Sequence, residues 1–178
     1  MSNSTLQRQR KVRASISIKT PILKVWKTIS GASNLEMYHP FCKKNPVKKW
    51  GNKEAEDSIE YYNGHRLYRK FTDWQEGKGY ALVISSRKNK IAHVIWNLKA
   101  THSESTELSI EITTYIDSAL RRYPRIFRSL FWTIYGRNTL KTYLENVVMG
   151  CKYFTETGIP VQENQFGANK MFSARKER

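Results

Sequence analysis

The stretch that decides the fold is ISIKTPILKVWKTISGASNLEMYHP, residues 16–40. Its first residues complete a segment, 12–20, in which apolar and polar residues alternate as in a half-buried β-strand. Thr20 and Pro21 then indicate a helix start, because the hydroxyl can cap free backbone amides and proline fits the first helical turn. Apolar residues recur at helical spacing as far as Gly31, and a second short helix fills the rest of the stretch. We therefore expect a strand followed by two short helices.

Six further strands are predicted between residues 43 and 118, where apolar segments alternate with short polar turns. In chain order the segments are NPVKKW, DSIEYYN, HRLYRKFTDW, YALVISSR, IAHVIWNLKAT and TELSIEITTYID. Asn63-Gly64 is the strongest turn signal, because this pair favours the tight turns of β-hairpins. Together with the first strand, these segments predict a curved antiparallel sheet.

The longest helical pattern follows Pro124 and reaches Thr157, with Gly158 at its end. Its apolar residues form two stripes that fall out of phase near Gly136, so we expect a bend or break there. One strand, two short helices, six strands and a long helix make an α+β pattern in which the helix lies across the sheet.

Length and composition agree with one globular domain, since 178 residues with 39% hydrophobic content can bury one core. We expect this domain at 11–160, between a flexible basic arm at 1–10 and a flexible basic tail at 161–178. The formal net charge of +16 is spread over the whole chain. It favours phosphate-bearing partners, with a solvated surface that binds nothing specific as an equal alternative. The sequence shows neither a signal peptide nor a run of apolar residues that could span a membrane, which predicts a cytoplasmic protein.

Residues 16–40, together with LKTYLENVVMGCKYFTETG at 140–158, resemble the START-like or Bet v 1-like (SRPBCC) superfamily, in its branch of polyketide cyclases, dehydrases and lipid-transport proteins. The resemblance covers about residues 11–160. It implies a helix-grip fold, a strongly bent seven-stranded sheet around a long C-terminal helix, with a cavity that holds a lipid, sterol, quinone or polyketide. A minority of members are enzymes. The chain departs from the family in its basic character and in the extra length at 121–136.

The apolar faces of the predicted strands and of the closing helix give the candidate ligand-binding residues. They are Leu67, Phe71, Leu82, Ile84, Val94, Trp96, Leu98, Ile110, Ile112, Tyr143 and Val147. Apolar walls with a few polar groups suit a lipophilic pocket, and Tyr62, Tyr68, Arg69 and Tyr143 could supply the polar groups. The same faces could instead pack on one another and leave no cavity, and the resemblance favours the cavity.

No catalytic residue, cofactor or metal site is predicted. The sequence lacks the short motifs of hydrolases, P-loop proteins, dinucleotide-binding proteins and zinc proteases. Glu36 and His39 alone are too weak a signal for a metal site, and a packing or capping role is favoured for His39. Cys42 and Cys151 lie far apart and are expected to be free thiols.

The leading functional hypothesis is binding, extended to transport, of a lipid, quinone or polyketide-like molecule. The alternative is a cyclase or dehydratase that acts on a polyketide-like substrate in the same cavity. The residues do not bear on the oligomeric state.

Residues 121–132, RRYPRIFRSLFW, interleave arginines with aromatic residues. As a helix they would form an amphipathic basic surface, which suits an anionic membrane. The membrane-surface candidates are Arg121, Arg122, Arg125, Phe127, Arg128, Phe131 and Trp132. Packing of the apolar stripe on the protein's own sheet is about as favoured, whereas nucleic acid is disfavoured because it needs aromatic residues exposed beside the charge. Our hypothesis is that the segment lies at the cavity entrance and touches membranes transiently during ligand loading.

Overall fold

The fold is that of a computed structural model, which describes residues 8–87 and 89–174. Residues 1–7 of the expected arm and 175–178 of the expected tail lie outside the described residues. The elements in chain order are β1 (Gln9–Ile18), α1 (Ile22–Ser30), α2 (Leu35–Tyr38), β2 (Cys42–Lys44), β3 (Val47–Lys49), β4 (Glu56–Tyr61), β5 (Arg66–Gln75), β6 (Gly79–Ser86), β7 (Asn89–His102), β8 (Ser105–Tyr115), α3 (Ile116–Ala119), α4 (Arg128–Phe131), η1 (Trp132–Gly136) and α5 (Arg137–Thr157). Two short helices follow the first strand and a long helix closes the chain, as predicted.

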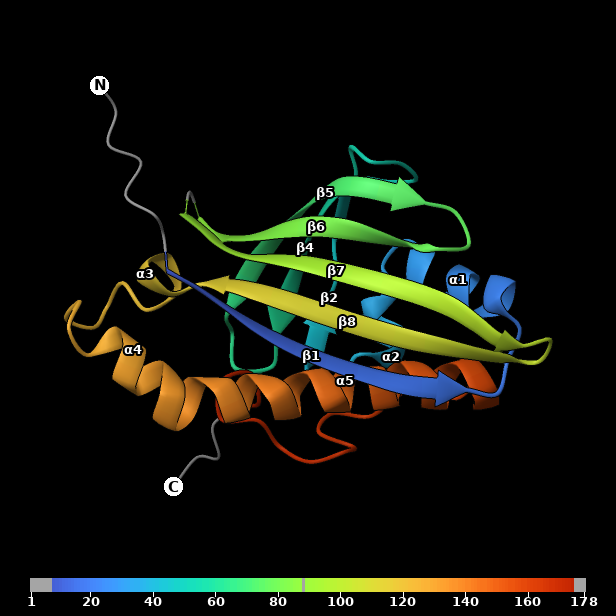
Figure 1. The fold of residues 1–178 in the computed structure, drawn as a ribbon. Helices are drawn as coiled ribbons and strands as arrows, with labels where there is room; N and C mark the ends of the chain where they lie inside the picture. Colours follow the sequence, from blue (N-terminus) through green and yellow to red (C-terminus); the bar gives the residue numbers. More distant parts are fainter. Residues whose placement is uncertain (1–7, 88, 175–178) are drawn as a thin grey trace.

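The strands form one antiparallel sheet in the order β1-β8-β7-β6-β5-β4-β2. β3 also pairs with β4, so β2 and β3 share the last of seven positions across the sheet. β1 closes the opposite edge by pairing with β8, where Val12 lies opposite Ile112. Figure 1 shows the curled sheet with α5 running along it. The predicted α+β class and the helix-grip fold are therefore confirmed.

The apolar face of α5 packs against the sheet and against α2. Its buried apolar residues follow the predicted stripe: Leu140, Tyr143, Leu144, Val147, Val148 and Cys151. Gly150 lies against the backbone of α2, because a Cβ atom at this position would be 2.1 Å from the Tyr38 carbonyl oxygen. A side chain at residue 150 would push α2 away from α5, and with it His39, which follows α2 directly.

The helix ahead of α5 changes register at Gly136. α4 begins at Arg128, and the π-helical turn η1 connects it to α5 without a break. The extra residue in a π turn shifts the apolar face around the helix, which explains why the two predicted stripes are out of phase. Gly136 permits the turn, because a Cβ atom there would lie 2.9 Å from the Trp132 ring. The bend or break expected near Gly136 thus takes the form of a π turn.

The described part of the N-terminal arm belongs to the domain. β1 begins at Gln9, and the carbonyl oxygen of Arg8 accepts a hydrogen bond of 2.9 Å from the N–H of Ile116. Residues 8–10 therefore extend the edge strand of the sheet, where we expected a flexible arm.

The C-terminal segment, residues 159–174, runs back along α5 (Figure 1). The N–H of Val161 donates to the Met37 carbonyl oxygen at 2.9 Å, and Asn169 donates to the Thr139 carbonyl oxygen at 2.9 Å. Phe172 is buried. The tail expected to be flexible from residue 161 is therefore packed on the domain as far as residue 174. Single residues make these contacts, so no periodic pattern in the sequence predicts them.

Candidate ligand site

A small cavity of about 40 Å³ lies between the inner face of the sheet and α5. The lining residues that the sequence predicted are Leu82, Ile84, Val94, Trp96, Ile110, Ile112, Tyr143 and Val147. The lining residues that it did not name as ligand-binding are Leu35, His39, Ile59, Tyr61, Arg69 and Leu144. A cavity of this size has room for roughly one or two water molecules, whereas sites for drug-sized ligands measure about 300–1,000 Å³. The side chains therefore fill most of the space that a ligand would need.

Three predicted candidates lie away from the cavity lining. Phe71 and Leu98 are buried in the core, and Leu67 is half-buried at its margin. Phe71 packs its ring against Trp50 at 5.2 Å and against Tyr80 at 5.1 Å, so it belongs to a separate aromatic cluster. The alternation of a strand identifies its inner face, but it does not tell where along that face the packing leaves space.

Two of the six missed lining residues come from an element that periodicity could not orient. Leu35 and His39 belong to α2 and its C-cap, which are too short to show a stripe. Arg69 is a polar candidate by sequence, and a charged residue gives no sign of burial in the sequence. Ile59 and Tyr61 lie on β4 and Leu144 lies in the apolar stripe of α5, so a periodic signal was present for these three.

His39, Tyr143 and Tyr61 form a buried row of hydrogen bonds beside the cavity. The Nε2 atom of His39 lies 2.9 Å from the Tyr143 hydroxyl, and the two tyrosine hydroxyls are 3.1 Å apart. His39 Nδ1 accepts a hydrogen bond of 3.2 Å from the backbone N–H of Phe41. In a neutral imidazole the hydrogen is then on Nε2, which donates to Tyr143. Either tyrosine can donate to the other, and one phenolic hydrogen is left for a group in the cavity.

Burial sets the protonation of this row. Desolvation, and secondarily the charge of Arg69, lower the pKa of His39 to about 3, so the imidazole is neutral at neutral pH. Desolvation raises the pKa of Tyr143 to about 12 and the pKa of Tyr61 well above its usual value. All three side chains are therefore uncharged over the physiological range.

The guanidinium of Arg69 lines the cavity and is paired with Asp57 behind it. Arg69 Nε donates to Asp57 Oδ1 at 2.7 Å, and Nη2 donates to Oδ2. Asn45 donates to the same carboxylate at 3.0 Å. Burial opposes the charge of Arg69, yet the attraction and hydrogen bonds of Asp57 outweigh it and raise the pKa of Arg69 above its usual value. The pair brings no net charge to the cavity.

Phe172 of the C-terminal segment covers the tyrosines from outside. Its ring stacks on Tyr61 at 4.3 Å and lies 4.5 Å from the ring of Tyr143. Phe172 also lines a second, outer pocket of about 240 Å³, together with Asn63, His65, Lys170, Met171 and Ser173. The same side chain therefore borders the outer pocket and packs on residues of the inner cavity.

Two of the predicted polar candidates do not reach the cavity. Tyr68 is exposed on the outer face of the sheet, and Tyr62 is half-buried outside the cavity lining. Tyr68 and Arg69 are neighbours on β5, so their side chains point to opposite faces of the sheet. Arg69 and Tyr143 therefore supply the polar groups, together with His39 and Tyr61.

The two cysteines are buried free thiols, as expected. Desolvation raises the pKa of Cys42 and of Cys151 to about 12, so neither forms the thiolate that nucleophilic chemistry requires. Across residues 8–87 and 89–174, no three His, Cys, Asp or Glu side chains gather into a group that could hold a metal ion.

The segment 121–136 contributes no residue to the cavity lining, so the expectation that it lies at the cavity entrance is not met. Of its membrane-surface candidates, Arg121, Arg122, Arg125 and Phe127 are exposed, and Phe131 is half-buried. Trp132 is buried beside Gly136 and is not a surface residue, since the π turn directs it inward. None of the described helices has both the length and the apolar character needed to cross a bilayer.

No protein-family model matches the sequence, and no curated protein sequence matches it. Solved structures match the fold. The Zhui aromatase/cyclase from Streptomyces sp. R1128 has a TM-score of 0.62 and 14% identity, over 86% of this chain and 100% of that protein. DynU16, a protein from the dynemicin biosynthetic locus, has a TM-score of 0.61 and 15% identity over 86% of this chain. The match spans 51% of DynU16, about half of its length.

A protein of unknown function from Staphylococcus aureus matches with a TM-score of 0.65 and 10% identity, over 85% of this chain and 97% of that one. At these identities the likeness concerns the backbone alone. It agrees with the curled sheet and the long closing helix described above, and the chain has a fold of the helix-grip type.

Proposed function

We propose that the protein belongs to the START-like branch of polyketide cyclases and lipid-transport proteins, and that it binds a hydrophobic small molecule between the sheet and α5. One observation carries the proposal: the apolar wall formed by β6, β7, β8 and α5 meets four buried polar side chains at a single cavity. These are His39, Tyr61, Arg69 and Tyr143. Apolar walls with a few convergent polar groups are the usual design of small-molecule sites.

The polar groups favour an uncharged ligand that carries an oxygen acceptor. The row from His39 through Tyr143 to Tyr61 leaves one phenolic hydrogen to donate. The charge of Arg69 is balanced by Asp57, so an anionic ligand would bring an unmatched charge into a buried site. A quinone or a polyketide-like carbonyl compound therefore fits these groups better than a free fatty acid.

A ligand of that size requires the cavity to open. We assign the opening to Phe172, because it stacks on Tyr61 and Tyr143 and also lines the outer pocket. Withdrawing this ring would leave the outer side of Tyr61 and Tyr143 uncovered, so that these two side chains, which line the cavity, could move towards the outer pocket. The ring belongs to the C-terminal segment and not to the sheet or to α5, so it can leave without disturbing either.

The test is native mass spectrometry of freshly purified protein, followed by organic extraction of whatever has co-purified. A stoichiometric quinone or polyketide would support the proposal. Uptake of a neutral fluorescent dye such as Nile red is then compared between the wild type, Phe172→Ala and Phe166→Ala. Phe166 lies on the same segment and packs on Tyr153, away from the cavity. We expect Phe172→Ala to take up dye severalfold more readily than the other two. A chain that carries no ligand and takes up no dye in any of the three forms would refute ligand binding.

The second candidate function is a cyclase or dehydratase in the same cavity. It is favoured by the hydrogen-bonded row of His39, Tyr143 and Tyr61, which could hold and polarise a carbonyl group, and by the fold shared with the Zhui aromatase/cyclase. The discriminating variant is Tyr143→Phe, which keeps the ring but removes the hydroxyl. A carrier would keep most of its ligand affinity in this variant, whereas an enzyme would bind the substrate and lose turnover.

A further inference from the structure

We propose that residues 121–137, the docking segment, bind the surface of a membrane that contains anionic lipids. The proposal does not depend on what the cavity holds. It rests on three features of the segment: an exposed apolar row, an excess of arginine, and a set of hydrogen bonds that fixes the segment to the body of the protein.

The apolar surface of the described chain is concentrated in this segment. Five of the eleven large apolar side chains that are exposed in residues 8–87 and 89–174 lie between positions 123 and 134. They are Tyr123, Ile126, Phe127, Leu130 and Ile134. Ile126 and Ile134 are 79% and 70% exposed. Leu130 and Ile134 are four residues apart in the continuous helix of α4 and η1, and Ile126 ends the loop directly ahead of this helix. An apolar row of this kind in water needs a partner to cover it.

The charge around this row has a single sign. No aspartate or glutamate occurs from residue 118 to residue 144, whereas Arg121, Arg122, Arg125, Arg128 and Arg137 all fall in that interval. All of these except Arg128 are exposed. Arginines attract anionic headgroups while apolar residues enter the headgroup and acyl boundary, which is how amphipathic helices bind the surface of a bilayer.

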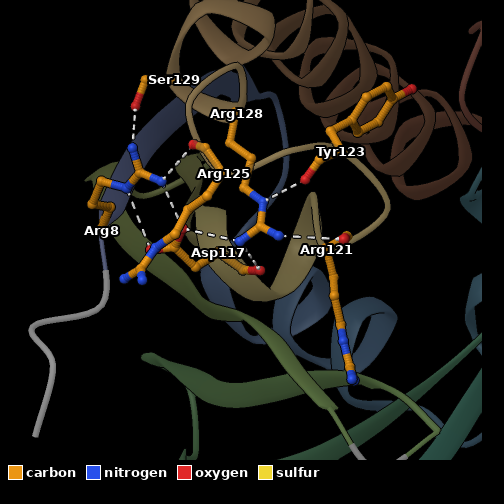
Figure 2. Close-up of polar contacts among 7 residues, drawn as sticks. All are labelled: Arg8, Asp117, Arg121, Tyr123, Arg125, Arg128 and Ser129. Atoms are coloured by element: carbon orange, nitrogen blue, oxygen red, sulfur yellow. Dashed lines mark hydrogen bonds and ion pairs between the residues drawn. The ribbon is translucent and has the colours of Figure 1, made fainter.

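Asp117 fixes the segment in place (Figure 2). Arg8 donates to its carboxylate from Nη2 at 2.7 Å and from Nε at 3.3 Å, and Arg128 Nη1 donates at 3.3 Å. Arg125 Nε lies 4.0 Å from the same carboxylate. The three arginines exceed the single negative charge by two, so the cluster remains positive towards solvent.

Arg8 and Arg128 also bind the backbone of the loop ahead of α4. Arg128 Nε donates to the Tyr123 carbonyl oxygen at 2.9 Å and Nη2 donates to that of Arg121 at 3.3 Å. Arg8 Nη2 donates to the Arg125 carbonyl oxygen at 3.2 Å. Figure 2 shows these bonds as dashed lines from Arg8 and from Arg128 to the loop. The loop is therefore tied to Arg8, directly ahead of β1, and to α3, while Ile126 and Phe127, which end the loop, are exposed.

The kinds of apolar side chain on the exposed surface favour lipid over nucleic acid. The most exposed apolar side chains, Ile126 and Ile134, are aliphatic, and bases stack on aromatic faces. Tyr123 already uses one face against Phe131, with ring centroids 4.5 Å apart. Aliphatic side chains bury well among acyl chains, so the lipid surface satisfies both the apolar row and the arginines.

The test is flotation of the full chain with vesicles of phosphatidylcholine alone and of phosphatidylcholine mixed with phosphatidylserine. We expect binding to the mixed vesicles that weakens as salt is added. Ile126→Ser combined with Leu130→Ser should lower the partition coefficient at least about tenfold, since it removes two side chains that enter the boundary. The matched control is Ile159→Ser with Leu23→Ser, because both of these side chains are also exposed but lie outside the segment.

A second pair of variants tests the charge. Arg121→Gln with Arg122→Gln should weaken binding roughly thirtyfold at low salt, given the usual contribution of a basic residue near an anionic surface. Lys24→Gln with Lys27→Gln removes the same charge from exposed positions on α1 and should have a much smaller effect.

Three results would overturn the proposal. The first is equal loss of binding in the α1 control, which would mean attraction by net charge alone. The second is vesicle binding that none of these variants changes. The third is absence of binding to the mixed vesicles. Weaker binding of a single-stranded oligonucleotide, or loss of a dimer in analytical ultracentrifugation, in the variant of Ile126 and Leu130 would then assign the apolar row to nucleic acid or to a second copy of the chain.

Discussion

Asp57 and Asp117 each hold arginine side chains, and they do so in opposite ways at two places in the molecule. Asp57 is fully buried and meets one guanidinium, that of Arg69, with Asn45 filling the remaining hydrogen-bonding capacity. Asp117 is near the surface and is approached by three arginines. A buried charge must be balanced because its desolvation is costly. Near the surface an excess of positive charge is tolerated, and it remains available to an anion from outside.

The difference separates two kinds of site. Around the cavity, every ionisable group is either paired or held neutral by burial, which suits an uncharged ligand. Around the docking segment, one carboxylate orders the arginines without cancelling their charge, which suits a negatively charged surface. Variants of the two aspartates, of His39 and of the docking segment probe this contrast, from the largest expected effect to the smallest.

Asp57→Asn should destabilise the protein by about 3–5 kcal/mol, because it leaves the buried guanidinium of Arg69 without its counter-charge. The free energy of unfolding from urea denaturation measures the effect. The double variant Asp57→Leu with Arg69→Met should recover most of the loss, since it removes both buried charges. A cost below about 1 kcal/mol for the single variant would show that Arg69 reaches solvent and that the contrast between the two aspartates is wrong.

The buried His39 should make the protein less stable in mild acid. Its folded pKa is lowered to about 3, while in the unfolded chain it takes up a proton at about 6.5. Between these two pKa values the unfolded state binds more protons than the folded state. The contribution of His39 to stability is therefore fully present above about pH 6.5 and falls as the pH falls towards 3. The variant His39→Gln should flatten the curve of unfolding free energy against pH between 7 and 5. His65→Gln, at an exposed position, should leave the slope as it is.

The contribution of Asp117 to stability should depend on pH in a more acidic range than that of His39. Hydrogen bonding by Arg8, with further contributions from Arg128, lowers its pKa to about 2. The stabilisation is present above the usual pKa near 3.9 and is lost as the pH falls through about 2. Asp117→Asn at neutral pH should cost about 1 kcal/mol, and less in high salt because the cluster is near the surface. A cost that does not change with salt would mean that the cluster is shielded from solvent.

Ile126→Ser should change the free energy of unfolding by no more than about 0.5 kcal/mol, because the side chain is 79% exposed. Trp132→Ala, only six residues further along the chain, should cost about 3–5 kcal/mol, since that ring is buried. Thermal unfolding of the two variants compares the exposed and the inward faces of one segment. A large loss of stability in Ile126→Ser would show that the residue packs against the protein, and the docking proposal would then lose its apolar row.

Much of the fold could be predicted, and the cavity only in part. The spacing of Leu140, Tyr143, Leu144 and Val147 identified the buried face of α5 before its partner was known. The inner faces of β6, β7 and β8 followed in the same way from their alternation. That pattern could not distinguish Phe71, which packs in an aromatic cluster, from Leu82, which lines the cavity. Both residues occupy the same kind of position in a strand, and only the packing around them differs.

The sequence by itself determined the order of the elements, their inward faces, the turn at Asn63-Gly64 and the change of register near Gly136, because these depend on neighbours a few residues apart. Only the tertiary structure decided which distant groups meet. Arg8 binds Asp117 across 109 positions, and His39 binds Tyr143 across 104. Phe172 reaches Tyr61 from a segment without any periodic pattern. Such contacts depend on how the whole chain packs, and a polar or isolated residue carries no local sign of the burial that gives it a partner.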